Sequence, residues 1–451
     1  MKNFTTNRHK LTRTYCPISY QKFVSVRVYS RLIMIFLFSI LTLNVSAQYF
    51  ETPYPLMPYF DEAPAIGSRS AVLIDAESGA LIYSKNPNEE IPPASITKLM
   101  TMHLVMKEIK EGRASYDEII PITVESWAQS QPSQSSLMFL EPGQIVTLRE
   151  ILLGLAVSSG NDAAAAAALR LAPSMEDFVE MMNLEARRMG LNITRFEDAS
   201  GYSDQNMTTA EELAFFCFQY IQLHPDSMKD FHSVVEYSYP TADNIPQGYR
   251  RRISTITQPN RNTLLSKFEG ADGLKTGFIP ASGNSIALTA ARDNTRFILM
   301  LMGAPSGRRG ANIRETDSIN LLSWAFKNFK TVRFNVGQID DIKLWKGKEK
   351  FVKLKLANNE LKIRNVELEN NNPKEISFTS FIDRSDSLSY EIIFNGTLKA
   401  PLPADHPVGY LVVYDNIGEV HRVTLVTEKE YEKGNIFKRI WDGIVLLFKS
   451  K

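Results

Sequence analysis

Residues 92–101 read PPASITKLMT, which places a serine and a lysine three residues apart, directly after two prolines. Proline favours the first turn of a helix and rarely continues inside one. Apolar residues then recur at near-helical spacing from Leu99 to Val105. The pattern predicts that Ser95 lies in the first turn of a helix, with Lys98 one turn on and on the same face. A hydroxyl beside an amine is either a nucleophile with its base or a pair of solvated polar side chains.

The bulk composition is that of an ordinary globular protein. The chain has 451 residues, 44% of them hydrophobic and 22% charged, which is enough for two or three domains with apolar cores. The formal net charge of +1 gives no indication of nucleic-acid binding. All of the basic excess lies in residues 1–47, which contain no acidic residue, so the rest of the chain is mildly acidic.

The N-terminal segment predicts export. A basic head is followed by an apolar run at residues 32–43 (LIMIFLFSILTL) and by small residues up to Ala47. This order is typical of a secretory signal peptide, and we expect cleavage after Ala47, with an uncleaved anchor as the alternative. Cys217 would then be alone in the mature chain, inside an apolar run. We therefore expect a buried thiol, no structural disulfide and no cysteine metal cluster.

The pattern along the chain changes near residue 334. Residues 48–66 are rich in proline and aromatics and predict an extended lead-in. Between 67 and 333, strand patterns lie both before and after a group of helical patterns, which predicts an α+β domain whose antiparallel sheet carries helices on both faces plus a helical cluster. Alternating apolar residues at 334–430 predict a small all-β domain.

The last segment, 431–451, carries a broad apolar stripe with lysine and arginine beside it or at its end. Such a pattern favours an amphipathic helix that lies in a membrane interface. The alternative is a helix that docks on its own protein.

Three short motifs stand in order along the chain. They are S-x-x-K at 95–98, S-x-N at 159–161 and K-T-G at 275–277, which are expected at a helix start, at a break between two helices and in a strand. Each motif alone is weak, because S-x-x-K also occurs at 19–22 and a second Ser-Gly-Asn follows the K-T-G at 282–284, out of order. The ordered set is typical of penicillin-recognising serine acyltransferases.

The resemblance is closest to the low-molecular-mass penicillin-binding proteins, the D-alanyl-D-alanine carboxypeptidases. It rests on PPASITKLMT, on SSGNDAA at 158–164, on DGLKTGF at 272–278 and on Arg-Glu-Thr at 314–316. It covers nearly the whole mature chain and implies a β-lactamase/transpeptidase-like catalytic domain, a β-rich second domain and a C-terminal amphipathic anchor. The chain departs from some members at Phe278, where they carry a histidine after the K-T-G.

The chemistry accounts for the residue types in these motifs. Acyl transfer needs a nucleophile, Ser95, whose proton must be removed, and Lys98 can remove it only when neutral. Burial and a second cation, for which Lys275 is the candidate, both lower the pKa of a lysine. By the resemblance, Ser159 would pass the proton to the leaving D-alanine nitrogen. The alternative is that Ser95 and Lys98 have a purely structural role.

Substrate binding is assigned by the same resemblance. Asn161 would hold a substrate amide carbonyl; the alternative is that it only caps the N-terminus of a helix. Thr276 and Arg314 would bind the terminal carboxylate, unless Arg314 is a plain surface residue. Gly277 would let the substrate backbone lie against the strand edge. The backbone N–H groups of Ser95 and Phe278 would form the oxyanion hole.

These assignments predict a serine-type D-Ala-D-Ala carboxypeptidase that acts on peptidoglycan pentapeptides through an acyl-enzyme on Ser95, without cofactor or metal. β-Lactams would acylate the same serine. The protein would be peripheral on the periplasmic side of the cytoplasmic membrane. The alternatives are a DD-endopeptidase or β-lactamase of the same fold, and an idle wall-binding or shape-determining protein.

Overall fold

The computed structural model describes residues 63–247, 254–336, 339, 341–357, 375–382, 385 and 387–449. The predicted signal peptide and all but the last residues of the predicted lead-in lie outside these ranges. So do residues 360–368, part of which alternates between apolar and polar residues within the predicted all-β domain.

A five-stranded antiparallel sheet with the strand order β2-β1-β9-β8-β7 forms the centre of the first domain. Its strands are β1 (Ser70–Asp75), β2 (Leu81–Lys85), β7 (Ala271–Ile279), β8 (Gly283–Arg292) and β9 (Thr295–Ala304). Glu-Ser-Gly at 77–79, between two apolar runs, predicts a hairpin, and β1 and β2 form it. Arg-Asp-Asn at 292–294 predicts a turn, and it joins β8 to β9. That turn places Asp293 and Asn294 at positive φ, which short polar residues tolerate.

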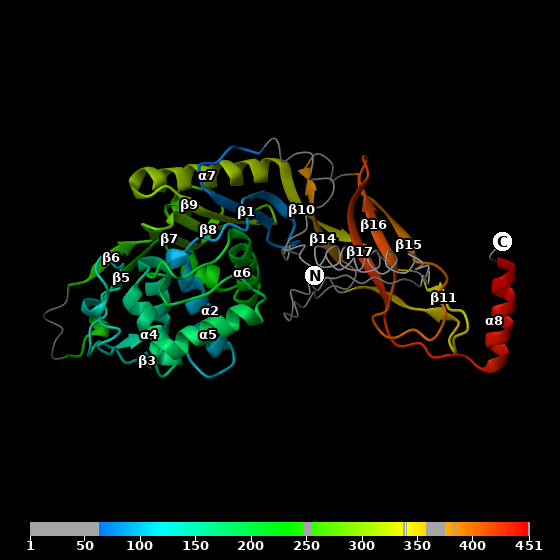
Figure 1. Ribbon diagram of the computed structural model, residues 1–451, viewed down its shortest axis with the longest axis horizontal. Helices are drawn as coiled ribbons and strands as arrows, with labels where there is room; N and C mark the ends of the chain where they lie inside the picture. Colours follow the sequence, from blue (N-terminus) through cyan, green and yellow to red (C-terminus); the bar gives the residue numbers. More distant parts are fainter. Residues whose placement is uncertain are drawn as a thin grey trace, which may run out of the picture. The chain divides into compact units, whose positions relative to one another are not determined.

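Both faces of this sheet are covered (Figure 1). Side chains alternate along β1, so Val72 and Ile74 join the core under the helical cluster, while Leu73 joins the core under α7 (Gly307–Asn328). Leu321 and Leu322 of α7 are fully buried in that second core. The α+β architecture that the sequence predicts is therefore present, with helices on both faces.

The helical cluster lies between β2 and β7 in the sequence. Its helices are α2 (Lys98–Lys110), α3 (Leu148–Leu153), α4 (Asn161–Leu171), α5 (Met175–Arg188) and α6 (Ala210–Leu223). The pattern Thr-Leu-Arg-Glu at 147–150 predicts a capping box. It forms at the start of α3, since the Thr147 side chain accepts from the Glu150 backbone and the Glu150 side chain accepts from the Thr147 backbone. Thr209 caps α6, since its side chain accepts from the backbone N–H of Glu212. Two short antiparallel strand pairs lie in the same part of the chain, β3 (Ile119–Ile120) with β4 (Val146–Thr147) and β5 (Glu236–Tyr239) with β6 (Ile256–Pro259).

The β-rich part has an apolar core of its own, which includes Val352, Leu411 and Leu425. Its strands are β10 (Phe329–Asn335), β11 (Ile342–Lys343), β12 (Phe351–Val352), β13 (Leu354–Leu356), β14 (Glu375–Phe381), β15 (Ser389–Phe394), β16 (Pro407–Tyr414) and β17 (Glu419–Thr427). They form a four-stranded sheet, β13-β17-β16-β15, and the pairs β10-β14 and β11-β12. β10 begins directly after α7, so β structure starts at Phe329, a few residues before the predicted boundary at 334.

The C-terminal helix α8 (Ile436–Lys449) exposes most of its apolar stripe. Phe437 and Phe448 are 81% exposed and Trp441 is 67% exposed. On another side of the helix, buried Asp442 accepts a hydrogen bond of 2.6 Å from the backbone of Lys346. Within the described ranges, no helix has the length and apolarity needed to cross a membrane.

Asp75 links the first domain to the β-rich part. Its buried carboxylate accepts from the hydroxyls of Thr331 on β10 (2.6 Å) and Thr379 on β14 (3.0 Å), and from the backbone of Glu77 and Ser78. Burial raises the pKa of Asp75, and these hydrogen bonds oppose the rise. The carboxylate therefore ties the β1–β2 turn to the first strand pair of the β-rich part.

Replacing Asp75 with alanine should lower the free energy of unfolding by about 2 kcal/mol, because two buried hydroxyls lose their acceptor. Urea unfolding followed by circular dichroism measures this change. Asp117→Ala is the matched control, since Asp117 is exposed. Equal stability of the two variants would contradict the role assigned to Asp75.

Candidate active site

The segment that carries Ser95 is a 3-10 turn, Ala94–Thr97, which leads without a break into α2 at Lys98. The sequence predicted a single helix start here, and the tighter turn is the difference. Strand β7 packs directly on this turn: a Cβ at Gly277 would lie 2.6 Å from the carbonyl oxygen of Pro93. A larger residue at 277 would push β7 away from the serine.

Lys98 is fully buried and contacts three oxygens. Its Nζ lies 3.1 Å from Ser95 Oγ, 2.8 Å from Asn161 Oδ1 and 2.7 Å from the carbonyl oxygen of Ser200. Burial lowers the pKa of Lys98 to about 7, and the charges of Asp198 and Asp162 oppose that shift. A lysine with this pKa is neutral in a large fraction of molecules near neutral pH.

The three contacts of Lys98 Nζ can accommodate a neutral amine as well as an ammonium. Asn161 Oδ1 and the Ser200 carbonyl can only accept, so the two hydrogens of a neutral amine satisfy both oxygens. The remaining lone pair of Lys98 Nζ then faces the Ser95 hydroxyl, which can donate to it. In the ammonium form all three positions carry hydrogens, and Ser95 Oγ can only accept. The neutral form is the one in which Lys98 can take the proton of Ser95.

The S-x-N motif occupies a strained turn. A π-helical turn, Gly154–Ser158, ends at Ser159, whose φ of 60° is left-handed, and α4 begins at Asn161. Among the described residues, the Ser159 hydroxyl has no hydrogen-bond partner. Asn161 donates from Nδ2 to Ser135 Oγ over 2.9 Å while its Oδ1 accepts from Lys98. Gly160 is the N-cap of α4, so the N-cap alternative for Asn161 is wrong.

The K-T-G motif lies on β7 at the edge of the sheet. In the described part of the chain, no strand pairs with the outer edge of β7. Lys275 is fully buried and donates from Nζ to the carbonyl oxygen of Thr276 over 3.1 Å. Phe278 is 47% exposed at the end of the motif.

Three cations gather around Lys275. Burial lowers its pKa well below the usual range, and the charges of Lys98, Arg261 and Arg314 lower it further. Burial is likewise the first cause of the lowered pKa of Lys98. The two amines interact as like charges, and burial is the larger influence on the pKa of each.

Arg314 is buried on α7, with 8% of its surface exposed, so the surface alternative is wrong. Burial lowers the pKa of its guanidinium, and Arg314 Nε has no hydrogen-bond partner within the described residues. A buried guanidinium with an unused donor is costly unless an anion approaches it. Lys275, Arg261 and Arg314 together form a basic cluster suited to a carboxylate.

Several residues that shape the site carry no sequence signal that we read. Asp162 accepts four backbone hydrogen bonds, three from residues 138–140 and one from Ala163, and so holds a loop beside α4. Arg261 lies in an irregular segment and reaches the site only through the fold. The Ser200 carbonyl and Asp198 belong to a loop with no recognisable motif.

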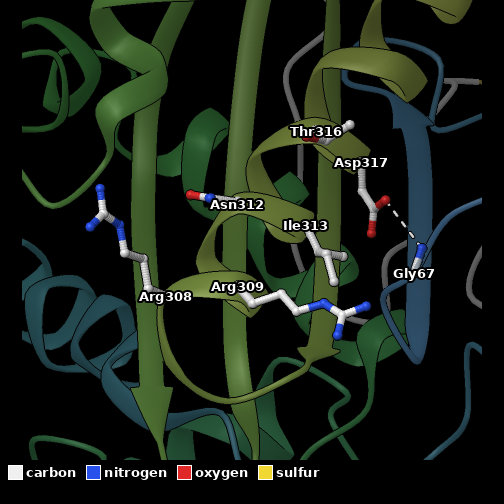
Figure 2. A pocket seen from close by; sticks show the side chains of 7 residues that line it. All are labelled: Gly67, Arg308, Arg309, Asn312, Ile313, Thr316 and Asp317. Carbon is white, nitrogen blue, oxygen red and sulfur yellow. Dashed lines mark hydrogen bonds between the residues drawn. The ribbon is translucent and has the colours of Figure 1, made fainter.

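Two cavities lie in this part of the protein, one beside residues of the candidate site and one on α7. One of about 240 Å³ borders Asn161, Asp198 and Ser200. A larger one of about 550 Å³ lies on α7 (Figure 2). It is lined by Gly67, Arg308, Arg309, Asn312, Ile313, Thr316 and Asp317, none of which the sequence places in the site. The smaller cavity is the one connected with the Ser95–Lys98 pair, because its lining residues Asn161 and Ser200 both accept from Lys98 Nζ, although neither Ser95 nor Lys98 lines it.

Comparison with known proteins identifies the family of this chain. A profile of the D-alanyl-D-alanine carboxypeptidase family (peptidase family S11) matches residues 58–306. The chain is 30% identical to a D-alanyl-D-alanine carboxypeptidase (DacD) of Escherichia coli over 413 residues, which cover 90% of this chain and 96% of the relative.

Solved structures agree with the sequence comparisons. Penicillin-binding protein 5 from Haemophilus influenzae superposes with a TM-score of 0.70 and 26% identity, covering 82% of this chain and 99% of the other. Penicillin-binding protein D2 from Listeria monocytogenes, in a cefotaxime-bound form, gives 0.50 and 26%, covering 58% and 99%. The serine and lysine that the sequence singles out thus lie in a known enzyme fold, and the chain belongs to the D-alanyl-D-alanine carboxypeptidase family of penicillin-binding serine peptidases.

Proposed function

We propose that this chain removes the terminal D-alanine from peptidoglycan pentapeptides through an acyl-enzyme on Ser95. Family membership supports the carboxypeptidase activity over the endopeptidase, β-lactamase and idle alternatives. The observation that carries the residue assignment is the position of Lys98 Nζ, 3.1 Å from Ser95 Oγ and bonded to two oxygens that can only accept.

That geometry supports the following reaction. Neutral Lys98 takes the Ser95 proton as Oγ forms a bond to the carbonyl carbon of the penultimate D-alanine. The backbone N–H groups of Ser95 and Phe278 stabilise the oxyanion. Ser159 passes the proton to the leaving nitrogen, the C–N bond breaks and D-alanine departs. Water then hydrolyses the ester and restores Ser95.

The basic cluster of Lys275, Arg261 and Arg314 selects the leaving group. A peptide that ends in D-alanine presents a free carboxylate one residue beyond the scissile bond, and Arg314, Lys275 and Thr276 would bind it. The extended peptide would lie along the open edge of β7, with Asn161 Nδ2 available to an amide carbonyl. β-Lactams carry a carboxylate beside a strained amide, and we expect them to acylate Ser95.

The remaining proposals concern location and domain limits. We propose a signal peptide at 1–47, an extended lead-in at 48–66, a catalytic domain at 67–333, a β-rich domain at 334–430 and a membrane-binding segment at 431–451. The exposed apolar stripe of α8 supports an interfacial position, because a helix with such a stripe and adjacent lysine and arginine buries its apolar side among lipid headgroups. The protein would be peripheral on the periplasmic side of the cytoplasmic membrane.

Acylation by benzylpenicillin should rise with pH through about 7, because the burial-lowered pKa of Lys98 means that its ammonium loses the proton there. Below that pH Lys98 is protonated and cannot accept the Ser95 proton. Intact-mass time courses between about pH 5 and about pH 9 measure the rate.

Lys98→Arg should abolish acylation at every pH, since a guanidinium stays protonated. Lys110→Ala, on the exposed end of the same helix, should behave as the wild type. Acylation of Lys98→Arg at the wild-type rate would refute Lys98 as the base.

Arg314→Ala should lower kcat/KM for a peptide that ends in D-Ala-D-Ala by about 10- to 100-fold, the range of a lost charged hydrogen bond. For the same peptide with a terminal carboxamide, Arg314→Ala should change kcat/KM little, because this peptide brings no negative charge to the basic cluster. Arg309→Ala serves as the control, since Arg309 is exposed on the same helix. An equal loss on both peptides would show that Arg314 does not recognise the carboxylate.

Removal of residues 436–451 should abolish sedimentation with vesicles that contain phosphatidylglycerol, because the exposed apolar stripe of α8 is lost. The double variant Phe437→Ser and Trp441→Ser should weaken binding without shortening the chain. Co-sedimentation followed by gel densitometry measures both. Undiminished sedimentation of the truncated chain would show that α8 is not the membrane-binding element.

A further inference from the structure

A short loop between α5 and α6 holds the side of Lys98 that faces away from Ser95. Two successive carbonyl groups of this loop point at α2. Thr101 Oγ1 donates to the carbonyl oxygen of Ala199 over 2.7 Å, and Lys98 Nζ donates to that of Ser200 over 2.7 Å. The position of the amine therefore depends on the path of the backbone at residues 199 and 200.

Asp198 fixes this path. Its Oδ1 accepts from the backbone N–H of Ser200 and of Gly201 (both 2.6 Å), from the Ser200 hydroxyl (2.8 Å) and from the Tyr202 N–H (3.3 Å). Its Oδ2 accepts from the Ser203 N–H (2.7 Å) and from Asn206 Nδ2 (2.8 Å). One carboxylate thus gathers six donors from a single turn of the chain.

The turn is also pressed against the segment that carries the nucleophile. Gly201 has a φ of +79°, and a Cβ at this position would lie 1.8 Å from the carbonyl oxygen of Ala94. Only glycine fits, so the loop touches the backbone next to Ser95 while its preceding residue binds Lys98. A displacement of this loop would move both members of the Ser95–Lys98 pair.

Asp198 is not placed to act as a base itself. A carboxylate has about four lone-pair positions, and all of them are occupied by donors of its own loop. These hydrogen bonds lower the pKa of Asp198 against the opposing effect of burial, so it remains charged and retains no position for a water proton. Its influence on the reaction must pass through Lys98.

We propose that Asp198 is a positioning residue for the acylation step: it shapes the turn whose Ser200 carbonyl holds the Lys98 amine against Ser95. This inference rests on the proposed function of Ser95 and Lys98.

The charges that face Lys98 come from three elements. Asp198 on the loop and Asp162 on α4 favour the ammonium form, and Lys275 on β7 interacts with Lys98 as a like charge. Burial opposes the ammonium form and is the largest influence. Removing the negative charge of Asp198 therefore lowers the pKa of Lys98 and leaves Asp162 as the remaining carboxylate near it.

The test measures benzylpenicillin acylation of the full chain from about pH 5 to about pH 9 and separates two quantities. The plateau rate at high pH reports how well the neutral amine is positioned. The midpoint of the acid limb reports the pKa of Lys98. Asp198→Asn should lower the plateau about tenfold or more and move the acid limb to lower pH. Asp204→Asn, an exposed residue of the same loop, should change neither.

A second variant separates geometry from charge and serves if Asp198→Asn does not fold. Ser200→Ala removes one donor to Asp198 but keeps the carboxylate and the Ser200 carbonyl. It should lower the plateau by a smaller factor and leave the acid limb in place. A plateau at the wild-type level in Ser200→Ala would contradict the positioning role.

For Asp198→Asn, a wild-type profile would overturn the inference, and so would a lower plateau with an unmoved acid limb, since that result indicates only a structural defect. If the wild-type chain itself forms no adduct, the proposed function fails, and the inference fails with it. The measurement on the wild-type chain is sufficient to recognise that outcome, so it is distinguished from a failure of the inference about Asp198.

Discussion

The burial of one amine determines how this protein is organised. Lys98 Nζ is removed from water and held by two carbonyl oxygens that can only accept, which leaves its lone pair to the Ser95 hydroxyl. An isolated buried ammonium is costly, and the protein meets this cost by lowering the pKa of Lys98 to about 7. The same burial that disfavours the charge makes the lysine a base near neutral pH.

Each major element contributes to this arrangement. The 3-10 turn before α2 presents Ser95, the π-helical turn before α4 brings Asn161 to the amine, and the loop at 198–203 supplies the third oxygen. β7 packs on the Ser95 turn through Gly277 and contributes Lys275 to the basic cluster, to which α7 contributes Arg314. Because β7 pairs with β8 and α7 packs on the same sheet, the basic cluster keeps its distance from the nucleophile.

The sequence predicted those parts of the site whose chemistry is local. The S-x-x-K spacing follows from one helical turn, the capping box at Thr147 from a four-residue pattern, and the β8–β9 turn from Asp293 and Asn294. It did not predict Asp198, Asp162 or Arg261, because their roles arise from contacts with residues far along the chain. It also missed the 3-10 and π-helical turns, since apolar periodicity does not separate these from an α-helix. The full burial of Lys98 and Lys275, which lowers the pKa of both amines, is a property of the packed structure and not of the motifs.

The most direct test is mass spectrometry of residues 48–451 after incubation with benzylpenicillin and, separately, with a peptide that ends in D-Ala-D-Ala. We predict a covalent penicilloyl adduct on the peptide that contains Ser95, and release of free D-alanine from the substrate. An adduct on another residue, or none together with no release of D-alanine, would contradict Ser95 as the nucleophile. Rapid hydrolysis of penicillin without a lasting adduct would instead identify a β-lactamase.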